Sequence, residues 1–348
     1  MNTKLWKVDK FVDISENNPH LVVAAELLRK NEVVALPTET VYGLGGNAKS
    51  DEAVAKIFAA KGRPGDNPLI IHIAERAQLQ EFVSEIPEKA SILMDAFWPG
   101  PLTIIFKKKV DVLSEKATAG LDTVAVRMPN HPVALALLKK SGLPIAAPSA
   151  NSSGKPSPTH AEHVLADLAG KIAGVLDGGA TGVGVESTVV DCTEQVPVIL
   201  RPGGVTKEQL EEVVGEVRVD PALSGTGELK PKSPGMKYRH YAPNAPLYLV
   251  EGSQSFLQEL VDEKRRENLR VGVLTTEENL PSFHADIVLA CGRRVELTSV
   301  ATALYETLRT FNDEKADIIF SEMFPSTGVG HAIMNRLQKA AGNKIIKE

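Results

Sequence analysis

Four basic side chains lie where short apolar segments end. Lys61 and Arg63 close an apolar-faced segment before a Pro-Gly turn, and Arg127 and Arg201 lie in or at the end of apolar runs. Cations at a helix C-terminus often only offset the helix dipole, but a buried arginine among apolar neighbours needs an anionic partner. His72 interrupts a similar run, LIIHI, as either a satisfied core residue or a group that points into a pocket. We therefore expect a local anion site, with Lys61 and Arg63 facing solvent in a cleft.

Three hydroxyl-rich loops accompany the predicted strands. They read PTETVYGLGG (37–46), APSANSSGKPSPT (147–159) and GGATGVGVESTVVD (178–191). Hydroxyl and amide groups donate hydrogen bonds to phosphates or a ribose, and open α/β sheets bind ligands beyond the carboxyl ends of their strands. The alternative is that these are ordinary flexible turns. Together with the four cations, in a chain of net charge −5, the loops favour a polyanion pocket, most simply for a nucleoside triphosphate.

Several known signatures are missing from the sequence. It contains no G-x-x-x-x-G-K-[ST], no H-E-x-x-H and no G-x-S-x-G. GLGGNA (43–48) imitates the dinucleotide fingerprint G-x-G-x-x-A, but the predicted strand before it ends too early, at Leu36, and no acidic residue closes a second strand about 20 residues later. We interpret GLGGNA as a glycine-rich turn that brings the backbone close to a neighbouring group, which could be a ligand, and not as a coenzyme site.

The elements that must position these groups are mixed strands and helices. Apolar runs predict strands at 32–36, 69–73, 102–106, 123–128, 144–149, 187–192 and 197–201. Capping signals indicate helix starts at Asn18-Pro19, at Ser50, at the pair Thr159 and Glu162, and at the pair Thr206 and Gln209. The fold class is therefore α/β, with a large mixed sheet.

The chain is long enough for two domains. Its 348 residues exceed the usual size of one domain. Residues 1–215 are predicted to form the large domain, and 216–246 a connector rich in Pro, Gly and Ser that is the only net basic stretch. Residues 247–348 alternate strands and helices with a βαβ rhythm, which predicts a smaller Rossmann-like domain with a parallel sheet.

Composition excludes several classes of protein. Hydrophobic residues make up 43% and charged residues 24%, which excludes wholesale disorder. Two cysteines exclude a disulfide framework or a Cys-rich zinc module. The net charge of −5 argues against a generic electrostatic grip on nucleic acid. With no signal core and no membrane-length apolar run, we expect a cytoplasmic protein without membrane contact.

Seven separated motifs resemble the threonylcarbamoyl-AMP synthase family, whose catalytic part is the YrdC-type domain. They are PTETVYGLG, KGRPGDNPLIIHI, FWPGPLT, VAVRMPNH, PIAAPSANSSGKPSPT, GVESTVVD and ILRPG, in the family's order over about residues 30–205. SPGMKYRHYAP and GVGHAIMNRLQKAA (328–341) further resemble the long, two-domain form. The resemblance implies a YrdC-like mixed twisted sheet.

The resemblance also implies a reaction. L-threonine, bicarbonate or CO2, and ATP would give threonylcarbamoyl-AMP and pyrophosphate, and a tRNA threonylcarbamoyl-transferase system would use the product. The family's catalytic tetrad falls on Lys61, Arg63, Ser149 and Asn151, which would also contact ATP. Threonine contacts fall on Thr38, His72, Arg127 and Ser187. Further ATP contacts fall on Thr123, Ser157, Arg201 and, in the connector, Tyr238 or Tyr241. Mg²⁺ would be held mainly by ATP, with no dedicated protein metal site.

Two alternatives remain open at the level of sequence. An RNA-binding or ribosome-maturation factor could use the concave basic surface of such a domain, and a weak RNA contact is compatible with either function. The smaller domain could also be a nucleotide-binding regulator, since GVGHAIMN resembles a glycine turn that enters a helix. The connector, with its cations and aromatic rings between two prolines, is predicted to close over the nucleotide as a lid.

Overall fold

A computed structural model describes the chain except for residues 1, 10, 12–13, 16 and 225–239. The chain divides into two compact units. The N-terminal unit comprises residues 1–153, 158–182 and 186–237, and the C-terminal unit comprises 154–157, 183–185 and 238–348. Two short loop segments that precede the connector in sequence thus belong to the C-terminal unit. Residues 225–239 of the predicted lid, which include Tyr238, lie outside the described residues.

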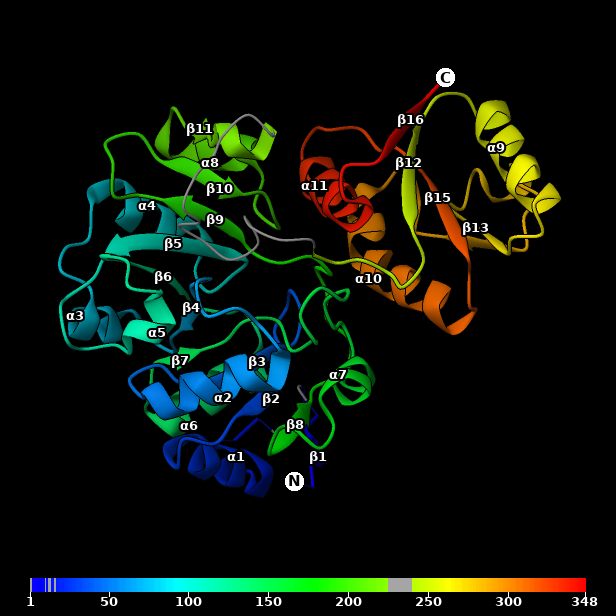
Figure 1. Cartoon of the computed structure of the whole chain (residues 1–348). Coiled ribbons are helices and arrows are strands. Elements are labelled where there is room, and N and C mark those ends of the chain that lie inside the picture. The colour runs from blue at the N-terminus through cyan, green and yellow to red at the C-terminus, as the bar shows by residue number, and fades with distance from the viewer. Residues whose placement is uncertain (1, 10, 12–13, 16, 225–239) are drawn as a thin grey trace. The chain divides into compact units, whose positions relative to one another are not determined.

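The N-terminal unit contains β1 to β11 with their helices (Figure 1). Its strands are β1 (Lys4–Lys7), β2 (Val34–Leu36), β3 (Gly43–Asn47), β4 (Ile70–His72), β5 (Leu102–Lys107), β6 (Thr123–Arg127), β7 (Ile145–Ala146), β8 (Gly174–Asp177), β9 (Thr188–Asp191), β10 (Val198–Arg201) and β11 (Arg218–Val219). Its helices are α1 (Pro19–Arg29), α2 (Asp51–Lys61), α3 (Leu79–Phe82), α4 (Glu88–Phe97), α5 (Glu115–Thr118), α6 (Pro132–Ser141), α7 (Ala161–Leu168) and α8 (Lys207–Val214). Short 3₁₀ turns cover Arg76–Gln78 and Pro221–Ser224.

The described strands of this unit form one mixed sheet in the order β1-β8-β2-β3-β7-β4-β6-β5-β9-β10-β11. The pairs β4/β6 and β5/β9 are parallel, whereas β4/β7 and β5/β6 are antiparallel. The predicted large mixed sheet is therefore confirmed. The carboxyl ends of β4 and β6 lie at the same end of the sheet as the amino ends of β5 and β9.

Alternate residues of the strands feed cores on opposite faces of this sheet. In β2, Val34 and Leu36 pack with α1 and α6, while Ala35 joins the cluster that includes α2 and α4. This is the period-2 alternation expected of strands buried on both faces.

Local capping signals set most of the predicted helix starts. The side chain of Asn18 accepts the amides of His20 and Leu21 at α1, and Ser50 accepts the amide of Ala53 at α2. Thr206 and Gln209 form the predicted capping box of α8. The prediction at Thr159 is wrong, because α7 begins one residue later, after His160, which makes no side-chain cap hydrogen bond.

The GLGGN segment is a strand, β3, and not the predicted turn. The reason is close packing. A Cβ on Gly45 would lie 2.8 Å from Leu36 Cδ2 and 3.0 Å from Ile145 Cγ2, and one on Gly46 would lie 3.1 Å from Ile57 Cδ1. These glycines let β2, β7 and α2 approach β3, which explains their presence without any ligand.

The C-terminal unit holds an all-parallel sheet in the order β14-β13-β15-β12-β16. In Figure 1, α9 covers one face, and α10 and α11 cover the other. The Rossmann-like prediction is confirmed. The elements are β12 (Leu247–Glu251), α9 (Gln254–Arg266), β13 (Val271–Thr275), a 3₁₀ turn (Leu280–Ser282), β14 (Ile287–Ala290), α10 (Leu297–Asp313), β15 (Ile318–Glu322), α11 (Gly330–Ala341) and β16 (Ile345–Lys347).

Both cysteines are free and buried. Burial raises the pKa of the Cys192 thiol to about 12, helped by Asp191, and burial likewise raises the pKa of Cys291 to about 12. Among the described residues, no helix has both the length and the apolar character needed to cross a membrane.

Candidate active site

One face of the N-terminal sheet carries polar groups at both ends of an apolar floor. The floor is the small cluster formed by Ile70, Ile105, Ala125, Val189 and Leu200. Side chains two residues from these along their strands point to the same face. This alternation places Thr123 and Arg127 on the same face as the floor, at opposite ends of β6. They are separated by roughly 13 Å at about 3.3 Å per residue. The site therefore has two ends, at the carboxyl and amino ends of β4 and β6.

At the carboxyl end, Arg127 is buried and tightly held. Its Nη2 lies 2.6 Å from Glu39 Oε1, its Nη1 donates to Thr40 Oγ1 at 2.8 Å, and its Nε donates to Gly100 O at 3.2 Å. Thr38 Oγ1 lies 2.9 Å from Thr40 Oγ1 and donates to the carbonyl of Val41. The 38–41 loop thus supports the guanidinium directly.

His72 pairs with Arg127 in the parallel register of β4 and β6. Its Nδ1 lies 3.2 Å from Ile70 O. Burial, reinforced by the Arg127 charge, lowers the pKa of His72 to about 3. The imidazole is therefore neutral at physiological pH, a state suited to hydrogen bonding and not to ion pairing.

Ser187 and Arg201 complete this end of the face. Ser187 Oγ lies 2.7 Å from Thr103 Oγ1 and accepts from Arg201 Nη2 at 3.1 Å, while Arg201 Nε donates to Ser187 O. The β9/β10 register shifts between Ile199 and Arg201. Such bulges re-aim side chains, which accounts for Arg201 reaching Ser187. The amide of Thr188 donates to Pro101 O, and the adjacent Gly100 carbonyl accepts from Arg127. Ser187 therefore lies near Arg127 in the site.

Lys61 lies at the other end, and the predicted solvent exposure is wrong for it. It is 4% exposed, and its Nζ donates to the carbonyls of Ser149 and Asn151, the latter at 2.7 Å. Burial first, and then the Arg63 charge, hold the pKa of Lys61 well below its usual range. Helix α2 ends on Gly62 in the left-handed conformation (φ 62°), so the turn can bring Lys61 inward. Three of the four predicted tetrad residues therefore meet at one point.

Arg63, the fourth, is half-buried and donates to the carbonyls of Asn67 and Pro68. These precede β4, at the same end as Thr123. The Asn67 side chain is buried, and neither its Oδ1 nor its Nδ2 has a hydrogen-bond partner among the described residues. Sequence reasoning missed Asn67, because an Asn before a proline suggests a turn; a buried amide with no partner is the signal that identifies it.

The 38–42 loop connects the two ends. The amide of Ala150 donates to Tyr42 O, the amide of Tyr42 donates to Pro158 O, and the amide of Gly182 donates to Glu39 O. All three hydroxyl-rich segments singled out by sequence therefore converge. Tyr42 itself is structural: it is buried, its hydroxyl donates to Gly179 O, and burial beside Asp177 raises its pKa.

Two predicted ATP contacts belong to the C-terminal unit. Ser157 is buried in the 154–157 segment, where Arg309 donates to Pro156 O at 2.6 Å. Tyr241 is 6% exposed and adopts φ 63°. Its ring centre lies 5.3 Å from that of Tyr305 and 5.7 Å from Arg336 Cζ. Tyr238 lies outside the described residues, so the choice between the two tyrosines stays a prediction.

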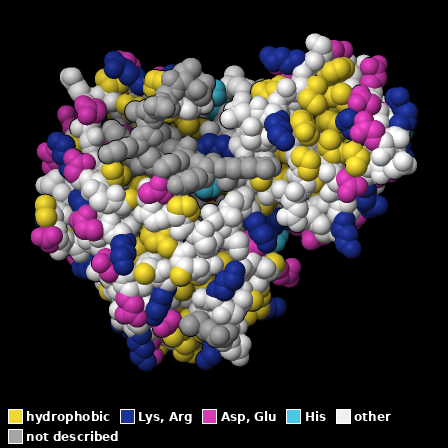
Figure 2. Space-filling view, viewed as in Figure 1, with side chains coloured by type: hydrophobic (Ala, Val, Ile, Leu, Met, Phe, Trp, Pro, Cys, Tyr) yellow, Lys and Arg dark blue, Asp and Glu magenta, His cyan; other side chains and the backbone are white. Residues whose placement is uncertain are grey.

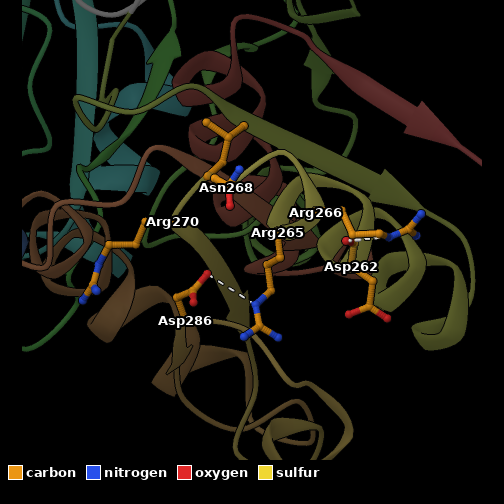
Figure 3. Close-up of a pocket in the computed structure, with 7 residues that line it drawn as sticks. Asp262, Arg265, Arg266, Asn268, Arg270 and Asp286 are labelled. Carbon is orange, nitrogen blue, oxygen red and sulfur yellow. Dashed lines mark hydrogen bonds and ion pairs between the residues drawn. The ribbon is translucent and has the colours of Figure 1, made fainter.

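The C-terminal unit also has a shallow arginine-lined hollow beside the end of α9 (Figure 3). Arg265 faces Asp286 at 3.6 Å, and Arg270 lies 3.3 Å from Glu314. Arg266 donates to the carbonyl of Asp262. Each cation already has a partner, so the hollow offers little unbalanced charge to a ligand.

Two family models match the chain. One described as "Telomere recombination", for Sua5, YciO and YrdC, matches residues 26–203, and one described as "Threonylcarbamoyl-AMP synthase, C-terminal domain" matches 205–342. The threonylcarbamoyl-AMP synthase of Bacillus subtilis is 60% identical over 347 residues, covering 100% of both chains. The chain belongs to the threonylcarbamoyl-AMP synthase family. The Pyrococcus abyssi relative is 50% identical over 93% of this chain and 95% of its own.

Solved structures agree with this family. P. abyssi Sua5 in complex with L-threonine matches with a TM-score of 0.93 and 48% identity, over 99% of this chain and 100% of that chain. Escherichia coli YciO matches with a TM-score of 0.52 and 23% identity, over 58% of this chain, which shows a shared fold only.

Proposed function

We propose that this chain is an L-threonylcarbamoyladenylate synthase, which makes threonylcarbamoyl-AMP and pyrophosphate from L-threonine, bicarbonate or CO2, and ATP. The observation that carries the proposal is the two-ended face of the N-terminal sheet. At one end, buried Arg127 lies among Glu39, Thr40 and the Gly100 carbonyl. At the other end lie buried Lys61 and half-buried Arg63. An amino acid and a triphosphate, side by side, fit that division.

The end with Arg127 suits the amino acid. Its guanidinium would pair with the threonine carboxylate, and the neutral His72 and the hydroxyls of Thr38 and Ser187 would hydrogen-bond the remaining polar groups. The apolar floor next to them would accept the methyl group. None of these residues is a nucleophile in this scheme; they hold the carbamate in line with the α-phosphate.

The end with Lys61 suits the phosphates. Lys61, Arg63, Ser149, Asn151 and Thr123 are assigned to it. Arg201, also a predicted ATP contact, instead contacts Ser187 at the end that holds Arg127. Attack of the carbamate oxygen on the α-phosphorus forms an O–P bond, and pyrophosphate leaves with the electron pair of the broken P–O bond. Because charge is displaced onto the leaving group, fixed cations stabilise the transition state.

Mg²⁺ is part of this proposal. The oxygens that accept hydrogen bonds from Lys61 are the neutral backbone carbonyls of Ser149 and Asn151. Mg²⁺ commonly keeps several waters and binds through substrate phosphates. These neutral oxygens suit an ion that arrives with ATP. When bound, the ion would neutralise phosphate charge.

The proposal has two further parts. A tRNA threonylcarbamoyl-transferase system would use the product, and the protein would be located in the cytoplasm, where ATP and tRNA occur together. The alternative of an RNA-binding factor has weaker support. On the visible face, Lys and Arg are interspersed with Asp and Glu, without one large basic patch (Figure 2).

The test is pyrophosphate release by the purified full-length chain. Release should require L-threonine, bicarbonate and ATP together, and mass spectrometry should detect threonylcarbamoyl-AMP. Release that ignores threonine or bicarbonate would contradict the proposal, and RNA binding at physiological salt without any adenylate would favour the alternative.

A further inference from the structure

Glu39 carries a buried carboxylate that the assigned roles do not use. Its side chain is 14% exposed, and its Oε1 lies 2.6 Å from Arg127 Nη2. Its Oε2 is buried and has no hydrogen-bond partner among the described residues. A buried anionic oxygen without a donor is costly, so such a group is a candidate for contact with a ligand.

An unpartnered oxygen alone does not decide this. Glu32 also has one buried oxygen without a partner in the described part of the chain, while its Oε1 lies 2.8 Å from Lys56 Nζ. Glu32 precedes β2, however, whereas Glu39 follows β2 in the loop that holds Arg127. The location of Glu39 distinguishes the two.

The chemistry of an α-amino acid requires two poles in one site. Its carboxylate and its ammonium are attached to the same carbon, so a complementary site needs a cation and an anion side by side. The residues assigned to threonine, Thr38, His72, Arg127 and Ser187, supply the cation and no anion. Glu39 and Arg127 supply both, 2.6 Å apart.

Arg127 can serve a second carboxylate without releasing Glu39. A guanidinium has five N–H groups. Three face Gly100 O, Thr40 Oγ1 and Glu39 Oε1. Two remain, with no partner among the described residues, for the carboxylate of the substrate.

We propose that Glu39 binds the α-ammonium group of the amino-acid substrate and thereby sets the preference for α-amino acids over α-hydroxy acids. This inference rests on the proposed function, because it takes the Arg127 end as the amino-acid site. It makes Glu39 a substrate-binding residue, distinct from a mere support for Arg127.

The test is equilibrium binding, without ATP, of L-threonine and of its α-hydroxy analogue, 2,3-dihydroxybutanoate of matching configuration. The analogue keeps the carboxylate and the side-chain hydroxyl but lacks the ammonium. The full-length wild type should bind threonine about 10- to 150-fold more tightly than the analogue, the range of one charge-assisted hydrogen bond. Glu39→Gln should lower the affinity for threonine by that factor and leave the affinity for the analogue unchanged. The variant would therefore lose the preference for threonine.

Glu32→Gln is the matched control, since it neutralises another glutamate that is ion-paired and has a buried oxygen without a partner in the described part of the chain. It should keep the wild-type preference. The inference is overturned if Glu39→Gln retains the preference for threonine. It is also overturned if Glu39→Gln weakens the binding of both ligands equally, and Glu39 would then be a support for Arg127. If Glu39→Gln does not fold, the wild type still decides, because equal affinity for both ligands overturns the inference. A wild type that binds neither ligand overturns the proposed function instead.

Discussion

Lys61 shows how one buried cation can serve both the fold and the reaction. Glutamine at this position would remove the charge at the phosphate end and the donor to the carbonyls of Ser149 and Asn151. We expect Lys61→Gln to lower the rate of adenylate formation about 10- to 150-fold and the free energy of unfolding by about 1–3 kcal/mol. Lys56→Gln, at a more exposed lysine paired with Glu32 and Glu52, is the control and should do neither. Near-normal turnover of Lys61→Gln would remove Lys61 from the phosphate site.

His72 should make the N-terminal unit sensitive to acid. Its pKa is about 3 in the folded protein and about 6.5 in an unfolded chain. Between these values the unfolded state binds the extra proton, so stability is complete above pH 6.5 and is lost as the pH falls toward 3, by about 1.4 kcal/mol per pH unit. Urea unfolding at pH 7, 6 and 5 should therefore show the wild type losing stability relative to His72→Gln. Parallel pH curves would contradict the buried neutral imidazole.

The hydroxyl groups around the amino-acid end should govern the choice of substrate. Valine replaces the threonine hydroxyl with a methyl group, which would leave polar partners such as Thr38 and Ser187 unsatisfied, whereas serine lacks only a methyl group. We expect kcat/KM to fall about 10-fold or more for serine and about 10⁴-fold for valine. Competition assays of pyrophosphate release measure both. Equal use of valine and serine would show that the site reads only the carboxylate and the amine.

At the scale of elements, β3 depends on having no side chain at Gly45. Alanine there would place a methyl group 2.8 Å from Leu36 and 3.0 Å from Ile145. Overpacking of this kind costs about 1–3 kcal/mol, which a urea titration would detect. Gly65→Ala, whose new methyl group would meet nothing within 4 Å, is the matched control. Equal stability of the two variants would mean that β2 and β7 can move apart at little cost.

The elements that sequence predicted were those with continuous apolar runs or explicit caps. The strands around 69–73, 102–106 and 123–128 occur as β4, β5 and β6, because buried strands need apolar residues on both faces. The short strands β1, β8, β11 and β16 were missed, since each holds at most two apolar side chains. β3 was missed because its glycines signal a turn, while its partners supply all of its packing.

The sequence predicted which residues form the site better than it predicted how they are arranged. Motif residues such as Lys61, Ser149 and Asn151 do meet in space. Sequence could not show that Lys61 is buried, because burial depends on where the 149–151 loop returns. Nor could it single out Glu39 or Asn67, whose importance lies in hydrogen bonds that they do not make.

At the scale of the whole molecule, the two units have separate sheets and separate cores. Both tryptophans, Trp6 and Trp98, belong to the N-terminal unit, so tryptophan fluorescence reports that unit alone. Phe320→Ala, in the C-terminal core, should cost that unit about 3–5 kcal/mol. Circular dichroism should then show an earlier unfolding phase, while the fluorescence midpoint stays unchanged. A matching shift in fluorescence would mean that the units unfold together.

The buried thiols have a practical consequence. With pKa values of about 12, Cys192 and Cys291 hold almost no thiolate at neutral pH. Maleimide reagents should therefore not label them. Cysteines introduced together at Val110 and Val295, both more than three-quarters exposed and one in each unit, would then be the reactive positions. The native chain is thus ready for two-colour single-molecule labelling, without removing its own cysteines, to follow the distance between its halves as nucleotide and amino acid bind.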